Sequence, residues 1–287
     1  MCDARGNIYF EPGMPYPADP AKWPVVRISA DAKQVTTITP DSVPGFNGGL
    51  SFASFTVGLR GEVYVIGATS DSFRLITFDD EGQYSSISRF DRTDFNPSQL
   101  AAFPSGELLV SGERMPGRGE AGRSEPFTAI FDRNARLLSD LKLAGDVKPQ
   151  ASPSGNPGPI LSNGAAVGAD DGNIYLMRAT ERPLVLVISP GGEILRKLTL
   201  DSPGERFHGS HFSVAGGKIV MEFFKPNNDE QNSGTFLYSL FDAETGERQF
   251  DYEPTEDANG IFACYTPGQF TFLGPDNDRL VIVHAVP

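Results

Sequence analysis

The chain has 287 residues, of which 21% are charged and 39% are hydrophobic, with 31 Gly and 23 Pro. This composition is typical of a globular protein rich in turns and excludes an intrinsically disordered chain. The net charge of −13 argues against nucleic acid as a partner, because phosphate binding needs clustered Lys and Arg. No apolar run approaches the ~20 residues of a membrane-spanning helix, so we expect no membrane span.

A short motif recurs six times along the chain and indicates a repeat protein. Each copy consists of a turn glycine, a polar residue and an apolar triplet. The six glycines are Gly6, Gly61, Gly106, Gly172, Gly217 and Gly268. Their spacings of 45 to 66 residues suit a propeller blade of ~40–50 residues with loop insertions.

Two further kinds of strand follow each triplet in chain order. The first is a run rich in β-branched and aromatic residues, predicted at 25–28, 75–79, 129–132, 184–187, 237–242 and 280–283. The second is an alternating run that predicts an outer strand, as at 34–38, 84–88 and 194–198. A strand before each turn glycine completes a four-stranded sheet, with strands a to d from the axis outward. The hydrophobic faces of one such sheet need neighbouring sheets to cover them.

The fold class predicted from these elements is all-β: a six-bladed β-propeller of four-stranded antiparallel blades. We expect a single domain over residues 1–287. Its blades are predicted at 1–40, 50–92, 98–144, 163–202, 208–254 and 259–287. The first blade begins in the middle of strand a, and the last one lacks strand d. We therefore expect residues upstream of Met1 to complete the ring; a natively three-stranded closing blade is the alternative.

Long insertions fall at one end of the predicted blades. Residues 12–23, 113–126, 145–162 and 225–234 all lie in b–c or d–a connections, whereas the a–b and c–d turns are tight. Loops elaborated on a rigid scaffold are where binding and chemistry usually occur. The long-loop face is therefore the predicted working face.

Three consecutive blades carry an Asn or His followed by glycine, nine positions before the turn glycine. These residues are Asn163, His208 and Asn259, and we expect them at the mouth of the central channel. Asp257 lies just ahead of Asn259. The four residues are the candidate ligand-binding set.

The repeat resembles that of six-bladed propellers of the NHL-repeat kind. The stretch 162–164, which leads toward the strand at 173–175, resembles the metal-site motif of the gluconolactonase (senescence marker protein) family. In that family an Asn-Gly and an Asp-Gly of consecutive blades, with an N-terminal Glu, hold a divalent cation that polarises a lactone carbonyl. Asn163 matches the Asn, whereas His208 stands in place of the Asp. The Glu has no counterpart, since it would precede Met1.

The resemblance implies one divalent metal ion at Asn163, His208 and Asn259. This set offers one imidazole and no formal negative charge, so it would hold Ca²⁺ or Mg²⁺ poorly and suits Zn, Cu or Ni better. Asp257 is a carboxylate within reach of the set along the sequence.

The remaining histidines and both cysteines are expected to be structural. His211 lies three residues from His208, which predicts that the two side chains point to opposite faces of a strand. His284 lies in the last apolar strand. Cys2 and Cys264 occupy the same repeat position; they are either two buried packing residues or a disulfide, which would imply an oxidising compartment.

Two functions from different classes remain open. The first is a binding module that holds a small molecule, a glycan or a protein at the long-loop face and channel mouth. The second is a metal-dependent hydrolase of the lactonase type. The composition also favours an exported bacterial protein, secreted or periplasmic, that is monomeric and kept in solution by its acidic balance.

Overall fold

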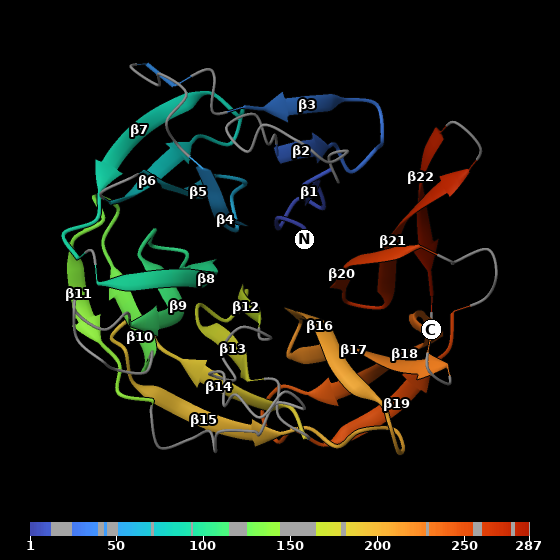
Figure 1. The fold of residues 1–287 in the computed structure, drawn as a ribbon. Helices are drawn as coiled ribbons and strands as arrows, with labels where there is room; N and C mark the ends of the chain where they lie inside the picture. Colours follow the sequence, from blue (N-terminus) through green and yellow to red (C-terminus); the bar gives the residue numbers. More distant parts are fainter. Residues whose placement is uncertain are drawn as a thin grey trace. The chain divides into compact units, whose positions relative to one another are not determined.

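The computed structural model describes residues 1–12, 25–39, 43–44, 51–69, 72–92, 94–114, 125–143, 165–178, 182–227, 230–254, 260–276 and 279–286. Every regular element in these ranges is a β-strand (Figure 1). The same ranges contain no apolar helix of the length that crosses a membrane.

The chain divides into two compact units. The first comprises Met1–Lys148 with Pro190–Gly192 and contains three antiparallel sheets. One sheet consists of β1 (Ile8–Phe10), β2 (Val25–Ile28) and β3 (Val35–Ile38). The next consists of β4 (Ser51–Val57), β5 (Val63–Ala68), β6 (Phe73–Phe78) and β7 (Tyr84–Arg89). The third consists of β8 (Phe95–Ala102), β9 (Leu108–Arg114), β10 (Glu125–Phe131) and β11 (Leu137–Asp140).

The second unit, Pro149–Ser189 with Glu193–Pro287, also contains three antiparallel sheets. The first consists of β12 (Ala165–Gly168), β13 (Ile174–Arg178), β14 (Leu184–Ile188) and β15 (Ile194–Thr199). The second consists of β16 (His208–Ala215), β17 (Lys218–Asn227), β18 (Glu230–Asp242) and β19 (Arg248–Tyr252). The last consists of β20 (Ile261–Thr266), β21 (Gln269–Asp276) and β22 (Arg279–Ala285).

Consecutive strands pair within every sheet, so each sheet is a meander. Six such sheets, one for each copy of the motif, confirm the predicted fold class: the chain is an all-β, six-bladed β-propeller. The apolar triplets lie in β1, β5, β9, β13, β17 and β21. The triplet strand is thus the first described strand of the first sheet and the second strand of each of the other sheets. The extent of the domain over residues 1–287 stays a prediction.

The turn glycines explain why the hairpins form where the motif recurs. All six have a positive φ, from 70° at Gly217 to 96° at Gly61, a conformation that costs little only in glycine. Aspartates at the start of the following turns add side-chain acceptors. Asp79 Oδ1, for example, accepts the backbone N–H groups of Glu81 at 3.0 Å and Gln83 at 2.8 Å, as Asx turns do.

Burial of the strands that carry the triplets forms the cores of the two units. In the first unit, Phe95 lies at the centre of an aromatic cluster, with its ring centroid 4.7 Å from that of Phe127 and 5.7 Å from that of Phe90. In the second unit, Met177 and Met221 are fully buried between the sheets of β13 and β17. This sheet-on-sheet burial is what the two hydrophobic faces of each blade require.

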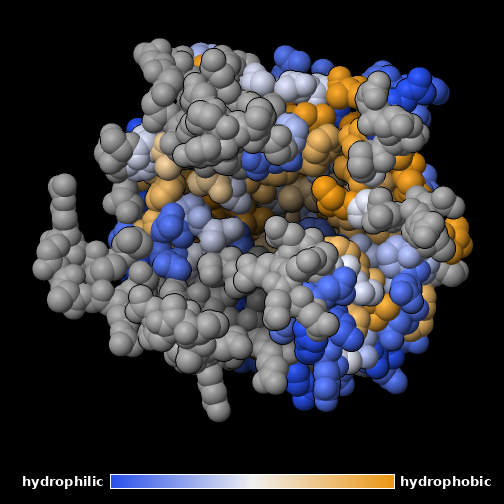
Figure 2. Space-filling model, turned by 45° about the vertical axis from the view of Figure 1, so that its right-hand side comes forward, coloured by the Kyte–Doolittle hydropathy of each residue, from blue (hydrophilic) through white to orange (hydrophobic). Residues whose placement is uncertain are grey.

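The first and last sheets contain three described strands each. In the first sheet, Cys2 adds a single antiparallel bridge to Ile8. In the last sheet, β22 is an edge strand on which Leu280 is 50% exposed. Figure 2, in which the right-hand side of Figure 1 comes forward, shows hydrophobic residues at the surface of the side that carries β22. A segment that would complete either sheet stays a prediction.

Both cysteines are disulfide-bonded, and neither is a free thiol. Of the two interpretations of Cys2 and Cys264, two unbonded packing residues is therefore wrong. His284 is an exposed residue whose Nδ1 lies 3.2 Å from Oγ1 of Thr271; its structural role stays a prediction.

Candidate functional site

The sheet β16–β19 carries the most distinctive polar side chains at one end. Strand β17 extends for 10 residues and β18 for 13, so their hairpin is longer than the strands of the other sheets. The candidate site lies at the end of the sheet where β16 begins and β17 ends. The b–c and d–a connections lie at this same end. We call the candidate site the β16–β18 surface, and it consists of His208, Ser210, His211, Glu222, Phe224, Phe236 and Tyr238.

The strand register arranges this surface in two rows. In the outer row, Phe224 of β17 pairs with His208 on one side and with Phe236 on the other. In the inner row, Glu222 pairs with His211 and Tyr238 in the same way. Because Phe224 and Glu222 are two residues apart on one strand, both rows lie on the same face of the sheet.

A β-bulge corrects one prediction. His208 and His211, three residues apart, were expected on opposite faces of the strand. The register shifts between Gly209 and His211, and the extra residue, Ser210, restores both histidines to one face. This is the ordinary effect of a bulge on side-chain alternation, and the sequence carries no clear signal for it.

Glu222 is the chemical centre of the surface. Its Oε1 accepts a hydrogen bond from the Ser210 hydroxyl at 2.6 Å, and its Oε2 accepts one from the Tyr238 hydroxyl at 3.1 Å. Burial raises the pKa of Glu222, and the two hydroxyl donors oppose that shift in part. A carboxyl group held by two neutral hydroxyl donors, with no cationic side chain in contact among the described residues, thus lies at the edge of the core.

The inner row continues into the hydrophobic core. Tyr238 is 2% exposed and packs against Phe262, with ring centroids 5.2 Å apart. The ring of His211 meets the same Phe262 edge-on at 5.9 Å. Burial lowers the pKa of His211 to about 4, so its imidazole is neutral at pH 7.

The outer row is an aromatic shelf that reaches solvent. The rings of Phe224 and Phe236 lie 4.9 Å apart at 41°, and Phe236 is 43% exposed. Gly234 permits this packing, since a Cβ there would collide with the Phe224 ring and with the carbonyl oxygen of Lys225. His208 is exposed beside the shelf.

The opposite face of the same strands anchors the surface. Gly209 lies against Pro183 and Met221, where a Cβ would come within 2.9 Å of the proline Cγ and 3.2 Å of the methionine sulfur. Further along, the Lys225 ammonium lies 5.4 Å from the centre of the Phe207 ring, a cation–π contact. Contacts on the opposite face of the sheet therefore hold the first residues of β16 in place.

The predicted ligand and metal set is described only in part. His208 is exposed at the first residue of β16, whereas Asn163, Asp257 and Asn259 lie outside the described residues. Within the described ranges, no group of three or more His, Cys, Asp or Glu side chains is placed to hold a metal ion. Sequence reasoning missed Glu222, whose acidic side chain in an otherwise apolar second strand was an available signal.

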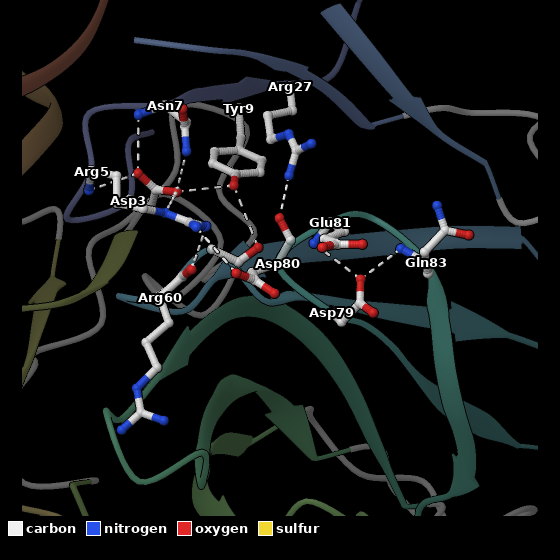
Figure 3. Close-up of polar contacts among 11 residues, drawn as sticks. Asp3, Arg5, Asn7, Tyr9, Arg27, Arg60, Asp79, Asp80, Glu81 and Gln83 are labelled. Atoms are coloured by element: carbon white, nitrogen blue, oxygen red, sulfur yellow. Dashed lines mark hydrogen bonds and ion pairs between the residues drawn. The ribbon is translucent and has the colours of Figure 1, made fainter. Parts of the chain in front are cut away.

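A second polar network lies at the turns of the first two sheets. The buried Asp3 accepts backbone N–H groups of Arg5 and Asn7 at Oδ1, at 2.9 and 3.0 Å. Its Oδ2 accepts the Asn7 amide at 2.8 Å and the Tyr9 hydroxyl at 3.1 Å (Figure 3). Burial, with Asp3 beside it, raises the pKa of Tyr9 to about 12. We call this group the turn network.

The turn network joins two neighbouring sheets of the first unit. The Arg5 guanidinium lies 3.5 Å from Asp3 Oδ2, and it donates to Asp80 Oδ2 at 3.1 Å and to the carbonyl oxygen of Arg60 at 2.6 Å (Figure 3). Asp3 therefore has backbone, amide, phenol and guanidinium partners at once. Its role is structural, since its hydrogen-bonding capacity is used within the protein.

Another charged cluster, in the third sheet, is also internally neutralised. Arg92 donates to both oxygens of Asp94 and to Asp140, and Arg114 donates to the same Asp140. Both guanidinium groups lie 5.5 Å from the centre of the Phe127 ring. Two cations with two anions leave no net charge for a ligand.

Comparisons with known proteins bear on the fold. No protein-family model matches the chain, and no curated protein sequence matches it. Among solved structures, the chain is similar to TolB from Acinetobacter baumannii, with 14% identity and a TM-score of 0.56 over 99% of this chain and 62% of that one. The chain thus spans less than two thirds of TolB.

Two further structures show the same fold. A putative exported protein from Bacteroides fragilis has 10% identity and a TM-score of 0.53, with 88% of this chain and 74% of that one covered. The GH74 xyloglucanase from Xanthomonas campestris has 14% identity and a TM-score of 0.53, with 100% of this chain and 43% of that one covered. These identities show the fold alone. The comparisons give no family evidence for NHL-repeat or gluconolactonase membership, and they support a β-propeller.

Proposed function

We propose that this chain is a binding protein whose ligand site is the β16–β18 surface. The observation that carries the proposal is the position of Glu222. Its carboxyl group is held by two hydroxyls on the same face as the solvent-exposed ring of Phe236. Binding sites combine aromatic walls with a few fixed polar groups in this way.

The scaffold suits a binding site because its side chains are held before any ligand arrives. Ser210 and Tyr238 orient the carboxyl group, and Gly234 leaves the space that the Phe224 ring occupies. Preorganisation of this kind reduces the entropy that binding would otherwise cost. Asn163, Asp257 and Asn259 remain proposed contributors.

We also propose a secreted or periplasmic location. Disulfides persist in oxidising compartments and are rare in the cytosol, and both cysteines of this chain are disulfide-bonded. Expression of the gene with its own upstream sequence, followed by cell fractionation, tests this. Recovery in the cytosolic fraction with reduced cysteines would contradict it.

A thermal-shift screen of the purified chain tests the binding function. The panel consists of neutral saccharides, amines, organic anions and extended peptides. We expect at least one class to raise the melting temperature, and the Phe236→Ala variant to lose that shift. Leu195→Ala is the matched control, because Leu195 is an equally exposed apolar residue (48%) on the outer strand β15. A shift that survives Phe236→Ala unchanged would contradict the proposed site.

The metal-dependent lactonase remains the second candidate. The observation in its favour is that His208 is solvent-exposed at the first position of β16, where an imidazole can reach a metal ion. Elemental analysis of the native protein separates the two functions. A stoichiometric divalent metal that is lost in His208→Ala and Asn163→Ala would favour the hydrolase; metal-free protein that still binds its ligand would exclude it.

A further inference from the structure

The outer and inner rows of the β16–β18 surface together restrict the shape, hydrogen-bond donors and charge of a ligand that fits there. The Phe224 and Phe236 rings, tilted by 41°, present flat π faces that carry partial negative charge. A ligand that covers them needs an apolar face with weakly positive hydrogens. Aliphatic C–H bonds next to oxygen atoms meet this need, because the oxygen withdraws electron density from them.

The inner row can accept hydrogen bonds from donors on a ligand. A carboxylate has roughly four lone-pair positions, and Glu222 uses two of them for Ser210 and Tyr238. Hydroxyl donors of a ligand fit the remaining positions, and each such bond is charge-assisted. The exposed hydroxyl of Ser210 and the imidazole of His208 extend the polar edge beside the shelf.

Charge restricts the ligand further. The chain carries a net charge of −13, and the surface itself holds a carboxyl group beside a partly buried histidine that is neutral at pH 7. The surface therefore disfavours anions. The groups that donate to Glu222 are neutral hydroxyls, and among the described residues no cationic side chain contacts its carboxyl group. The site is therefore built for neutral hydroxyl donors in preference to anionic groups.

From these requirements we infer, on the basis of the proposed function, that the ligand of the β16–β18 surface is a neutral carbohydrate. One face of a sugar ring stacks on Phe224 and Phe236, and its hydroxyls hydrogen-bond to Glu222 and Ser210. A pyranose combines an apolar C–H face with a rim of hydroxyl donors, which is the pairing that the two rows present.

Calorimetric titration with neutral di- to hexasaccharides of glucose, galactose, mannose and xylose tests the inference. We expect binding by at least one saccharide, weakened about tenfold by Phe236→Ala and kept by Phe236→Trp. Phe236→Leu retains an apolar side chain without a π face, so it should resemble Phe236→Ala. Glu222→Gln keeps the shape and removes the charge, and it should weaken binding about fivefold.

Leu195→Ala should bind saccharide as the unmodified chain does, which controls for loss of exposed apolar area. Full affinity in Phe236→Leu would overturn the stacking geometry. If peptides or amines bind and depend on Phe236 while no saccharide does, the carbohydrate inference fails and the binding function stands. If no class of ligand depends on Phe236, both fail.

Discussion

Two carboxyl groups of this propeller each accept a tyrosine hydroxyl, but their remaining contacts differ. Asp3 in the turn network and Glu222 in the β16–β18 surface each accept a tyrosine hydroxyl at 3.1 Å, from Tyr9 and Tyr238 respectively. Asp3 also accepts two backbone N–H groups and an amide, and it has a guanidinium 3.5 Å away. Glu222 has one further donor, Ser210.

The difference separates a carboxyl group that stabilises the fold from one that retains capacity for a ligand. The donors around Asp3 occupy its acceptor positions within a tight turn, so the carboxyl group of Asp3 stabilises the hairpin. Glu222 lies in a strand interior, where the backbone N–H groups belong to the sheet ladder and are not free to bond it. Its partners are side chains at the end of the blade, beside exposed aromatic rings. The predictions below test this contrast, from the largest expected effect to the smallest.

Replacement of Asp3 by Ala should have the largest effect on stability. It leaves two backbone N–H groups, the Asn7 amide and the Arg5 guanidinium without their shared acceptor. We expect a loss of about 4 kcal/mol in the free energy of unfolding, measured by urea denaturation. Ligand binding at neutral pH by the remaining folded protein should be unchanged. A loss below about 1 kcal/mol would show that the turn network is dispensable.

Gly61→Ala tests the same network through its packing. Gly61 has a φ of 96°, and a Cβ there would meet Asp3 Oδ2 at 2.8 Å and Tyr9 Oη at 2.9 Å. Backbone strain and overpacking together should cost about 3 kcal/mol. Gly172→Ala is the matched control: its φ is 86°, but no atom lies within 4 Å of the added Cβ. It should lose about 1 kcal/mol, and equal losses would contradict the packing account.

His211 should make the stability of the protein fall in acid. Its pKa is about 4 in the folded state against 6.5 for the free side chain, so the unfolded chain binds the proton more readily. The contribution is present above pH 6.5 and is lost as the pH falls toward 4, by about 3 kcal/mol. His211→Gln should remove this part of the pH dependence in urea denaturation followed from pH 7 to pH 4. An unchanged acid slope in the variant would contradict the burial of the imidazole.

Glu222→Gln should have the smallest effect on stability and the opposite pH dependence. Because burial raises the pKa of Glu222, the folded state holds the proton more tightly than the unfolded chain. Its contribution to stability is greatest below the unfolded pKa and decreases as the pH rises through the folded pKa. At pH 7 the variant should therefore differ by about 1 kcal/mol or less, in contrast to Asp3→Ala. A large loss at neutral pH would place Glu222 with Asp3 as a structural group.

The fold was predictable because the signal is repeated. A left-handed turn requires the glycine before each apolar triplet, and six copies at similar spacing indicate six blades. Even the outer strands β3, β7 and β15 follow from an alternating sequence, and in Tyr84–Arg89 partly buried and exposed residues alternate. The three-stranded last sheet was also expected.

The candidate site was predictable only in location. Counting along the repeat indicated His208, which lies at the end of the blade where the site is proposed, but not the residues around it. The bulge at Ser210 reverses the side-chain alternation, and no local sequence rule signals it. The contact between Glu222 and Tyr238 depends on the register of β17 with β18, which only the folded sheet fixes. The cysteine spacing, likewise, left a bonded and an unbonded state open.

The three histidines of the chain permit the most direct test of the central claim, that the β16–β18 surface is a binding site. Their imidazole NMR signals can be assigned with the variants His208→Ala, His211→Gln and His284→Ala. We predict that a bound saccharide shifts the signal of His208, and that of His211 to a smaller degree. The signal of His284, on β22 of the last sheet, should stay in place. A ligand that binds by calorimetry while the His208 signal remains unmoved would contradict the claim.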